Sequence, residues 1–540
     1  MLASPSYVNV RSAPFKARGD GIADDFPAIA AAIDAALASG GGIVHFPTGR
    51  YVLRSGHLSL GGSGACNLTL MGEGATGSVL MLGSAGACIL DWPGGRSVGL
   101  EIKNLGFDAA GYWASSCIAL ATFSGLRIDG CSFGGTASQP ALKLGRAQNF
   151  YGDPSGPALS RDVRVTNCRF PRHRGAGAYE AVRFAAVDGG VLSGCEFDDF
   201  DCGAVLLHTY CFNFSITDNV FRDAHPGAFD VVVENSGAES PDKSVPSIVI
   251  ARNRHVFSRG GSKSIVIGNS VNVLVENETI RGTVAQGEAP KGILVLDWCD
   301  GADSHPLVNP DSHDIVIRRN DVKDTYEGVG IAPSLRSHNR SFRMWGITIE
   351  DNTFSGQLGP VIQIGCPTVQ DVHHVSVLRN RMELPRSPAA AAIDVVGNPG
   401  YPSIVLQQDV KGTPSLHASP KTVWVSEAEG TVDGERLEIG SGPERETIEI
   451  RAVSRRKITT RFWKDHRAGE KLLPSVDGNG VSDVRLVGNV VAVGRASQSD
   501  TAISIKDAPV EEILGNDLGA AKKKLILLRG GSAAATDIRT

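Results

Sequence analysis

Twelve short segments of this 540-residue chain repeat one pattern. Each has two apolar residues spaced by two, then Asn or Cys, then usually Phe or another apolar residue, as in GLRIDGCSF (125–133) and GITIEDNTF (346–354). The alternation of apolar and polar residues is typical of a β-strand, and repeats about 20–40 residues apart are typical of a solenoid. One such unit cannot bury its apolar face alone, so we expect the coils to stack. The segments are 99–107, 125–133, 162–170, 189–197, 213–221, 247–257, 272–280, 314–322, 346–354, 374–382, 483–491 and 509–518.

One position in the pattern, two residues before the closing apolar residue, is Cys in early units and Asn in later ones. Asn tolerates a left-handed backbone and can hydrogen-bond an identical neighbour one coil away. Cys behaves as a small buried hydrophobe. We therefore expect a stacked corner inside the solenoid. It would be formed by Cys131, Cys168, Cys195, Asn219, Asn320, Asn352, Asn380, Asn489 and Asn516.

A second short apolar strand lies between successive units, as in AVRFA (181–185) and SIVIG (264–268). Two sheets that meet at an Asn corner, with loops of varying length elsewhere, predict an all-β chain folded as a right-handed parallel β-helix. The 64 glycines and the low aromatic content, 6%, agree with a fold of many strands and tight turns.

Composition excludes several classes of protein. A net charge of −5 argues against a nucleic-acid partner, which needs a basic face. No run of 18 apolar residues predicts a membrane span, and the start MLASPSYVNVRSAPF has no secretory signal pattern. The ten cysteines lack metal-type pairs and are expected to be free thiols. We expect synthesis in the cytoplasm and action outside the cell or on a virion.

Residues 8–54 differ from the repeats. A first strand is followed by Asp25, which is expected to cap a helix that begins at Phe26-Pro27. A glycine run, 40–42, ends that helix and leads into the next strand. The apolar side of the helix would be formed by Phe26, Ile29, Ile33 and Leu37.

This stretch resembles the pectate-lyase-like superfamily, whose members often begin with G-D-G-x-x-D-D-x-x-A-I-x-x-A-I followed by G-G-x-V-x-F-P-x-G-x-Y. The matching positions are Gly19, Asp20, Gly21, Asp24, Asp25, Ala28, Ile29, Ala32, Ile33, Gly41, Gly42, Val44, Phe46, Pro47, Gly49 and Tyr51, and 67–82 continue the match. The resemblance implies a β-helix that acts on a sugar polymer. The family includes glycoside hydrolases, polysaccharide lyases, epimerases and phage tailspikes. We expect Asp20, Asp24 and Asp25 to form part of a cap at the open end of the solenoid rather than a metal site.

The spacing of the repeats, and its interruption after residue 402, divide the chain into four parts. We expect an N-terminal capping segment at 1–54, the parallel β-helix at 55–402 and terminal coils with a tail at 481–540. The interval 403–480 holds short strands separated by charged turns, which predicts an inserted antiparallel β-module. Its role could be carbohydrate or subunit binding, or none.

Charged residues gather in a few consecutive coils between Lys143 and Lys263. Side chains of neighbouring coils line up about 5 Å apart, which suits an extended polymer. We expect Glu180 and Asp201 in equivalent positions of adjacent coils, with Asp230 one coil further. Such spacings suit the carboxylate pair of a glycoside hydrolase.

From this placement we predict Asp201 as the general acid and Glu180 or Asp230 as the base. The predicted substrate-binding residues are Arg183, His208, His225 and Lys263. Polygalacturonase-like enzymes place acidic, His and Lys residues in a similar order, but the N-T-D, D-D and R-I-K motifs are absent, so a galacturonan substrate is unsupported.

Two alternatives compete with a hydrolase. A polysaccharide lyase needs a base for the C5 proton and a cation for the uronate, for which Lys143, Arg183 and Lys263 could serve. Ca²⁺ could then bind at the group Asp198, Asp199 and Asp201, whereas the hydrolase needs no cofactor. The other alternative is a non-catalytic structural or receptor-binding virion protein, such as a tailspike.

An apolar ridge is expected on the outside of four successive coils. Leu206, Val232, Val266 and Leu294 point outward if their neighbours in the strands point inward. A ridge of this size needs a partner or a ligand to cover it. Together with the tailspike resemblance, it predicts a parallel homotrimer.

Overall fold

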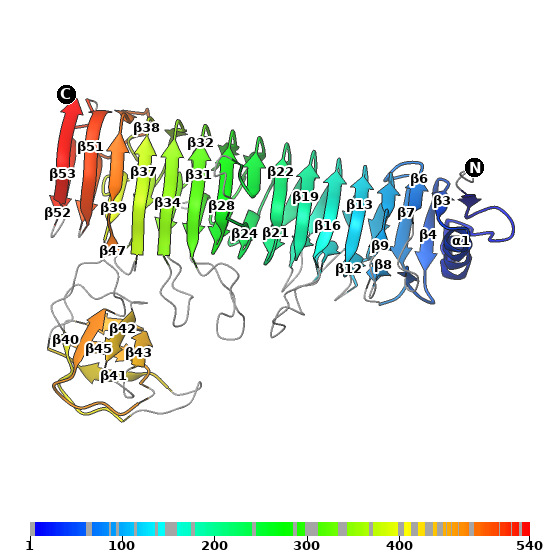
Figure 1. Ribbon diagram of the computed structural model, residues 1–540, viewed down its shortest axis with the longest axis horizontal. Helices are drawn as coiled ribbons and strands as arrows, with labels where there is room; N and C mark the ends of the chain where they lie inside the picture. The colour runs from blue at the N-terminus through cyan, green and yellow to red at the C-terminus, as the bar shows by residue number, and fades with distance from the viewer. Residues whose placement is uncertain are drawn as a thin grey trace.

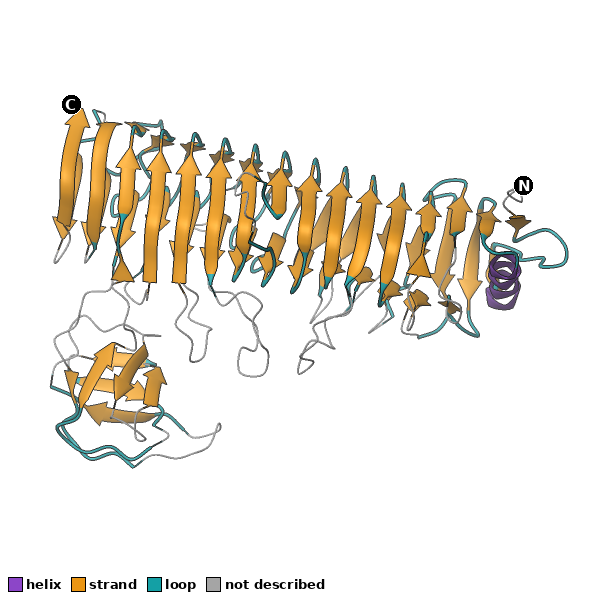
Figure 2. Ribbon diagram, in the orientation of Figure 1, coloured by secondary structure: helices purple, strands orange, loops and turns teal. Residues whose placement is uncertain are grey.

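The computed structural model forms a long right-handed parallel β-helix, as the repeats predicted, with one helix at its N-terminal end (Figure 1). Figure 2 shows that strands make up nearly all of its regular structure. The structure describes residues 6–60, 67–85, 88–92, 97–112, 116–135, 139–145, 159–173, 179–239, 245–283, 289–296, 311–332, 343–366, 371–397, 404–411, 419–426, 436–439, 446–449, 451–454, 456–462, 464–474, 480–506, 508–519, 521–528 and 532–539. In this part of the chain no helix is long and apolar enough to cross a membrane.

Each coil has three strands, and each strand pairs in parallel with its counterpart one coil further. One coil is formed by β13 (Phe123–Asp129), β14 (Ser132–Gly134) and β15 (Leu142–Leu144). These pair with β16 (Ser160–Thr166), β17 (Arg169–His173) and β18 (Glu180–Phe184). The Asn or Cys corner separates the first strand from the second, so the repeated pattern covers two strands. The pattern therefore made the first and second strands look like one unit, and the predicted two strands per coil are three in the structure.

The first strands of the coils follow one another through the larger sheet. They are β6 (Leu68–Gly72), β10 (Glu101–Lys103), β13, β16, β19 (Val187–Ser193), β22 (Phe212–Thr217), β25 (Ile248–Ala251), β28 (Val271–Glu276), β31 (Ser312–Arg318), β34 (Arg343–Glu350), β37 (Asp371–Leu378), β48 (Val484–Val487) and β51 (Pro509–Asp517).

The second strands belong to the same sheet. They are β4 (Gly49–Leu53), β7 (Ser78–Leu82), β11 (Gly106–Asp108), β14, β17, β20 (Glu196–Phe200), β23 (Val220–Arg222), β26 (Arg254–Val256), β29 (Thr279–Arg281), β32 (Asp321–Lys323), β35 (Thr353–Ser355), β38 (Arg381–Glu383) and β49 (Val490–Ala492).

The third strands form a separate 14-stranded sheet. They are β5 (Leu58–Ser59), β8 (Cys88–Trp92), β12 (Ser116–Leu120), β15, β18, β21 (Gly203–His208), β24 (Phe229–Glu234), β27 (Lys263–Gly268), β30 (Lys291–Leu296), β33 (Val329–Ala332), β36 (Ile362–Ile364), β39 (Ala391–Val396), β50 (Thr501–Lys506) and β52 (Lys523–Leu528).

The helix α1 (Phe26–Ala38) packs at the N-terminal end beside β1 (Ser6–Asn9) and β3 (Gly42–Phe46). Its buried residues are Ile29, Ala32, Ile33 and Ala36. Asp25 precedes the helix, but its carboxylate accepts hydrogen bonds from the backbone N–H groups of Arg18 (2.6 Å) and Gly19 (3.0 Å) and caps no helical N–H. The predicted position of Asp25 is therefore right and its predicted cap bond is wrong.

A ladder of amide side chains runs through the interior at the predicted corner. The Nδ2 of Asn320 donates to Oδ1 of Asn352 at 2.9 Å, and Asn352 donates in the same way to Asn380. Asn380 donates to Asn489 at 3.1 Å across the inserted interval, so the solenoid resumes in register. The full order is Cys131, Cys168, Cys195, Asn219, Asn253, Glu278, Asn320, Asn352, Asn380, Asn489 and Asn516.

The left-handed residue at this corner is the one before the ladder position. Asn167, Arg319, Asp351 and Arg379 have φ between 53° and 55°, whereas no ladder residue in the described chain has a positive φ. The ladder asparagines are thus selected for their hydrogen bonds, and not for the left-handed backbone that we expected of them.

The ladder predicts a large effect of one substitution. Asn352→Ala removes the acceptor of the Asn320 side chain and backbone N–H, and the donor to the Ile317 carbonyl. Because buried unsatisfied groups cost about 1–3 kcal/mol each, we expect the free energy of unfolding to fall by about 3 kcal/mol in urea titrations. Thr348→Ala, in strand β34 before this corner and only half-buried, is the control and should change the free energy of unfolding little. An unchanged midpoint for Asn352→Ala would contradict the role given to the ladder.

The inserted interval is an antiparallel module, as predicted. One sheet contains β40 (Ile404–Val405), β46 (Lys471–Pro474), β42 (Arg436–Ile439) and β43 (Glu446–Glu449), and the other contains β41 (Lys421–Trp424), β45 (Lys457–Thr460) and β44 (Ala452–Ser454). Its core is separate from that of the solenoid and is formed by Leu406, Val410, Val423, Val425, Ile439, Ile448, Ile458 and Phe462.

The apolar ridge is outside the main core, as expected, but it is not exposed. Leu206, Val232, Val266 and Leu294 are 0–4% exposed and form a cluster of their own with Phe229. The ridge is therefore buried within the single chain, and the expectation that a partner or ligand must cover it is wrong.

Candidate functional site

Glu180 opens β18 and is paired with an arginine of the same strand. Its side chain is only 7% exposed, and it accepts hydrogen bonds from Nη2 (2.6 Å) and Nε (3.0 Å) of Arg183. The Arg183 guanidinium also lies over the Tyr179 ring, 4.8 Å from its centroid. These two bonds occupy the Glu180 carboxyl group and hold it against its own strand. Neither residue is presented as a freely accessible catalytic group.

Glu180 and Asp201 do not occupy equivalent positions. The register pairs Glu180 with Gly203, so Asp201 lies two residues earlier, in the bend between β20 and β21. The predicted equivalence failed because it was read from the spacing of the strands, and the number of residues between β20 and β21 differs from the number between β17 and β18. In its actual place Asp201 faces His225, which the sequence had assigned only to substrate binding.

His225 is held between two carboxylates and an arginine. Its Nδ1 lies 3.0 Å from Oδ1 of Asp201, and its Nε2 lies 3.1 Å from Oδ1 of Asp199 and in hydrogen-bond contact with Arg259. The side chains of the His and of both Asp residues are 24–32% exposed, so solvent reaches the cluster. When Arg259 donates to Nε2, the proton of the neutral ring is on Nδ1 and is donated to Asp201. We call these four residues the His225 cluster.

Sequence reasoning missed Arg259, which follows β26 in the turn one coil beyond His225. A signal was present, because Arg259 occupies the lead-in of β27 as His225 occupies the lead-in of β24. The predicted cluster of charges included lead-in residues such as His225, but it passed from Glu234 to Lys263 without Arg259.

Asp230 lies inside the solenoid. It is 1% exposed, and its Oδ2 is 2.6 Å from Nδ1 of His255, whose Nε2 is 2.8 Å from Oε2 of Glu278. Burial raises the pKa of Asp230 to about 6. Burial would lower the pKa of His255, but its hydrogen bonds to the two carboxylates outweigh this and raise it to about 9. A carboxyl inside the coil cannot reach a polymer, so Asp230 does not belong to an outer site.

The remaining predicted residues lie apart from the His225 cluster or at its margin. His208 lies 3.9 Å from Glu234 of the next coil, and Lys263 donates to the Gly227 carbonyl at 3.4 Å. Asp198 pairs with Arg222 at 3.3 Å. Within the described ranges no three His, Cys, Asp or Glu side chains are grouped as metal ligands. Calcium binding at Asp198, Asp199 and Asp201 stays a prediction of the lyase alternative.

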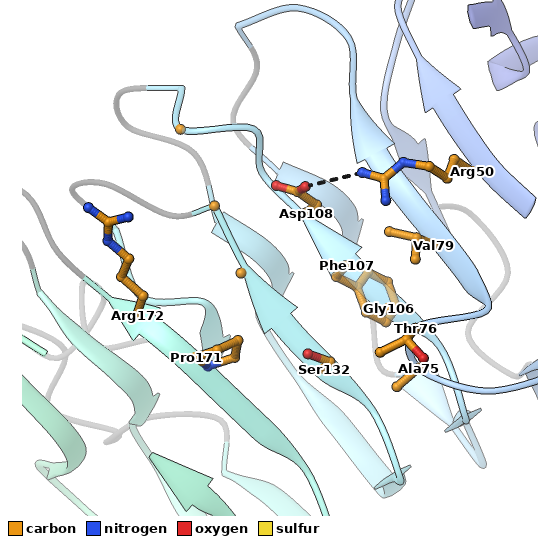
Figure 3. A pocket seen from close by; sticks show the side chains of 13 residues that line it. Arg50, Ala75, Thr76, Val79, Gly106, Phe107, Asp108, Ser132, Pro171 and Arg172 are labelled. Carbon is orange, nitrogen blue, oxygen red and sulfur yellow. Dashed lines mark ion pairs between the residues drawn. The ribbon is translucent and has the colours of Figure 1, made fainter. Parts of the chain in front are cut away.

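A cleft of about 630 Å³ opens on the outer face of the second strands, in the N-terminal coils (Figure 3). Its floor includes Gly106, Ser132, Gly134 and Pro171. Arg50 and Asp108 lie at one side with their charged atoms 3.8 Å apart, and Figure 3 shows Arg172 at the opposite side.

Comparison with known proteins gives a family match at the N-terminus and short alignments with curated relatives. Residues 7–91 match the family model described as "Rhamnogalacturonase A/epimerase, pectate lyase-like". Mannuronan C5-epimerase AlgE1 of Azotobacter vinelandii is 51% identical over 51 residues, which are 9% of this chain and 4% of that protein. Mannuronan C5-epimerase AlgE5 of the same organism is 43% identical over 70 residues, 13% of this chain and 7% of that protein. The chain thus spans only a small part of these relatives.

Two solved structures illustrate the structural similarity. The A-module of mannuronan C-5 epimerase AlgE4 from Azotobacter vinelandii aligns with a TM-score of 0.45 and 17% identity, covering 72% of this chain and 97% of that chain. A mutant tailspike protein of E. coli bacteriophage HK620, in complex with a pentasaccharide, aligns with a TM-score of 0.47 and 13% identity, covering 87% and 94%. The predicted resemblance to the pectate-lyase-like proteins is confirmed by the family match over residues 7–91, ahead of coils that continue as a parallel β-helix.

Proposed function

We propose that this protein acts on a polysaccharide and that the His225 cluster transfers a proton to or from the sugar. The observation that carries the proposal is the placement of His225, whose Nδ1 is oriented by Asp201 while Nε2 faces Asp199 and Arg259. An imidazole oriented by a carboxylate is the commonest device for general acid–base chemistry near neutral pH.

An acidic sugar suits this arrangement best. Removal of the C5 proton of a uronate needs a base at the proton and a cation at the carboxylate. His225 would supply the base through Nε2, whose lone pair becomes free when Arg259 moves from the ring to the sugar carboxylate, which a guanidinium binds through two N–H groups. The same first step serves a lyase and an epimerase. The names of the matched family and of the curated relatives, which include epimerases, support a reaction of this class.

A glycoside hydrolase is the second candidate. Asp199 and Asp201 both lie within 3.1 Å of His225, so two partly exposed carboxylates approach the same ring. In that reaction Asp201 would remain the acid, with Asp199 in place of the predicted bases Glu180 and Asp230.

One set of incubations separates the candidates. The protein is mixed with mannuronan, polygalacturonate and a neutral glucan, and three products are measured: new reducing ends, the ultraviolet absorbance of an unsaturated uronate, and the C5 epimer by proton NMR. Reducing ends alone indicate a hydrolase, reducing ends with absorbance a lyase, and the epimer alone an epimerase. Binding without any product would support the receptor-binding alternative instead.

The homotrimer and the virion location remain proposals that rest on the family resemblance alone, since that family includes tailspikes. We expect light scattering at micromolar concentration to give three times the 56.8 kDa of one chain. A monomeric mass would contradict the trimer.

A further inference from the structure

We infer that the cleft between Arg50 and Arg172 is a binding subsite for an acidic oligosaccharide, on a different strand series from β18, β21 and β24. The inference deepens the proposed function, on which its polymeric ligand rests. Its own observations are the shape, the charge and the position of the cleft.

The shape is that of an open trough across successive coils. Arg50, Val79, Gly106 and Ser132 share one register position on β4, β7, β11 and β14. With Arg172 on β17, the trough crosses four strand spacings, roughly 19 Å. The turn at Ala75 forms a wall, because a Cβ on Gly106 would lie 2.2 Å from the Ala75 carbonyl oxygen. By contrast, a Cβ on Gly134 would meet nothing within 4 Å, so the floor is open at that point.

The charge of the trough selects an anion. Its lining includes two guanidinium groups and one carboxylate, that of Asp108. The contact between Arg50 and Asp108 is long, 3.8 Å, and both side chains are at least one-third exposed, so most N–H donors of Arg50 stay available to a ligand. Arg172 makes no ion pair with any described residue and is exposed. Carboxylate groups on a carbohydrate complement two such guanidinium groups.

The position of the trough points to a polymer. Pro171 of the trough pairs with Asp198, and His173 pairs with Phe200. Arg172 therefore lies one strand from Asp199, a member of the His225 cluster. A chain bound from Arg50 to Arg172 would continue over that cluster, so the trough would hold units distant from the reacting sugar.

The test uses variants that fill the trough or remove its charge and leave the residues of the His225 cluster unchanged. Gly134→Leu places a side chain in the open floor, and Gly134 has no positive φ that would strain it. The matched control is Ser355→Leu, in the strand position equivalent to Gly134 but on a coil remote from the trough. Arg172→Asn removes one charge at a left-handed residue that Asn tolerates, and it stays informative if the Leu variant does not fold.

Affinity is measured by calorimetry with a uronic-acid hexasaccharide and, as the neutral probe, a glucan hexasaccharide. We expect Gly134→Leu and Arg172→Asn each to weaken binding of the acidic probe at least tenfold, with Ser355→Leu unchanged and the neutral probe bound weakly by all. Wild-type affinity in both trough variants, or no binding of the acidic probe by the wild type, would overturn the subsite. If the protein turns over the polymer and both trough variants keep wild-type affinity, the subsite is wrong and the proposed function stands. If the trough variants lose affinity but the wild type turns over no polymer, the subsite stands and the proposed function is wrong.

Discussion

Replacing His225 by Ala is expected to lower turnover of the polysaccharide by about 10²–10⁴-fold, because that is the usual contribution of a positioned general acid or base. Asp201→Asn should also lower turnover by orders of magnitude, because the ring loses the carboxylate that orients Nδ1. Neither change should alter thermal unfolding, since the side chains involved are partly exposed and belong to turns. Initial rates and calorimetric scans on the same preparations check both statements.

The matched control is His57→Ala. His57 also lies beside an aspartate, with Nε2 3.3 Å from Asp91, and is half-exposed on a coil far from the His225 cluster. It should keep wild-type activity. Full activity of His225→Ala would contradict the assignment, and an equal loss in His57→Ala would show that the effect is not specific to the cluster.

Replacing His255 by Ala is expected to lower the free energy of unfolding by about 3–5 kcal/mol, the usual effect of breaking a buried ion pair. The change leaves Asp230 and Glu278 in the interior, 1% exposed, with no cation beside them. It also removes the ring that stacks on Phe221 at 5.0 Å. Urea titration at neutral pH measures the loss, and a wild-type midpoint would contradict this account.

The buried groups Asp230 and His255 predict how the free energy of unfolding varies with pH. The pKa of His255 is raised from 6.5 to about 9, so its contribution is complete below pH 6.5 and is lost as pH rises toward 9. The pKa of Asp230 is raised from 3.8 to about 6, so its contribution is lost between those values as pH rises. Both shifts make the coil less stable as pH rises.

A triple variant provides the control for both measurements. Asp230→Ala, His255→Phe and Glu278→Asn together give these three successive coils the ring stack and the amide ladder of their neighbours. Buried ion pairs are often replaced by apolar groups without loss of stability. We expect the triple variant to be at least as stable as the wild type at pH 8 and to lack the pH dependence described above.

The repeated pattern predicted the fold because it is a local property of every coil. Apolar alternation and the Asn corner are sufficient to define stacked strands, and Asn320, Asn352 and Asn380 lie where expected. The same pattern did not reveal Glu278, which replaces Asn in the ladder, or His255, which continues the stack of phenylalanine rings.

The candidate site was harder to predict because it depends on turns rather than on strands. Turn lengths differ from coil to coil, so equal spacing along the chain did not place Glu180 opposite Asp201. In a regular strand, consecutive side chains point to opposite faces. Asp230 and Val231 are consecutive but both face the interior, so the alternation gave the wrong face for Asp230. His225 was included in the prediction, but its position between Asp199 and Asp201 depends on the path of the bends, which the sequence does not specify.

The most direct test of proton transfer by the His225 cluster is to follow deuterium. A uronate polymer is incubated with the protein in D₂O, and the carbon next to the carboxyl group is examined by NMR. The proposal predicts either deuterium at C5 of epimerised units or loss of the C5 proton in unsaturated ends, and neither product with His225→Ala. A polymer that keeps all of its C5 protons in the presence of the wild-type protein, or a variant that exchanges them as fast as the wild type, would contradict it.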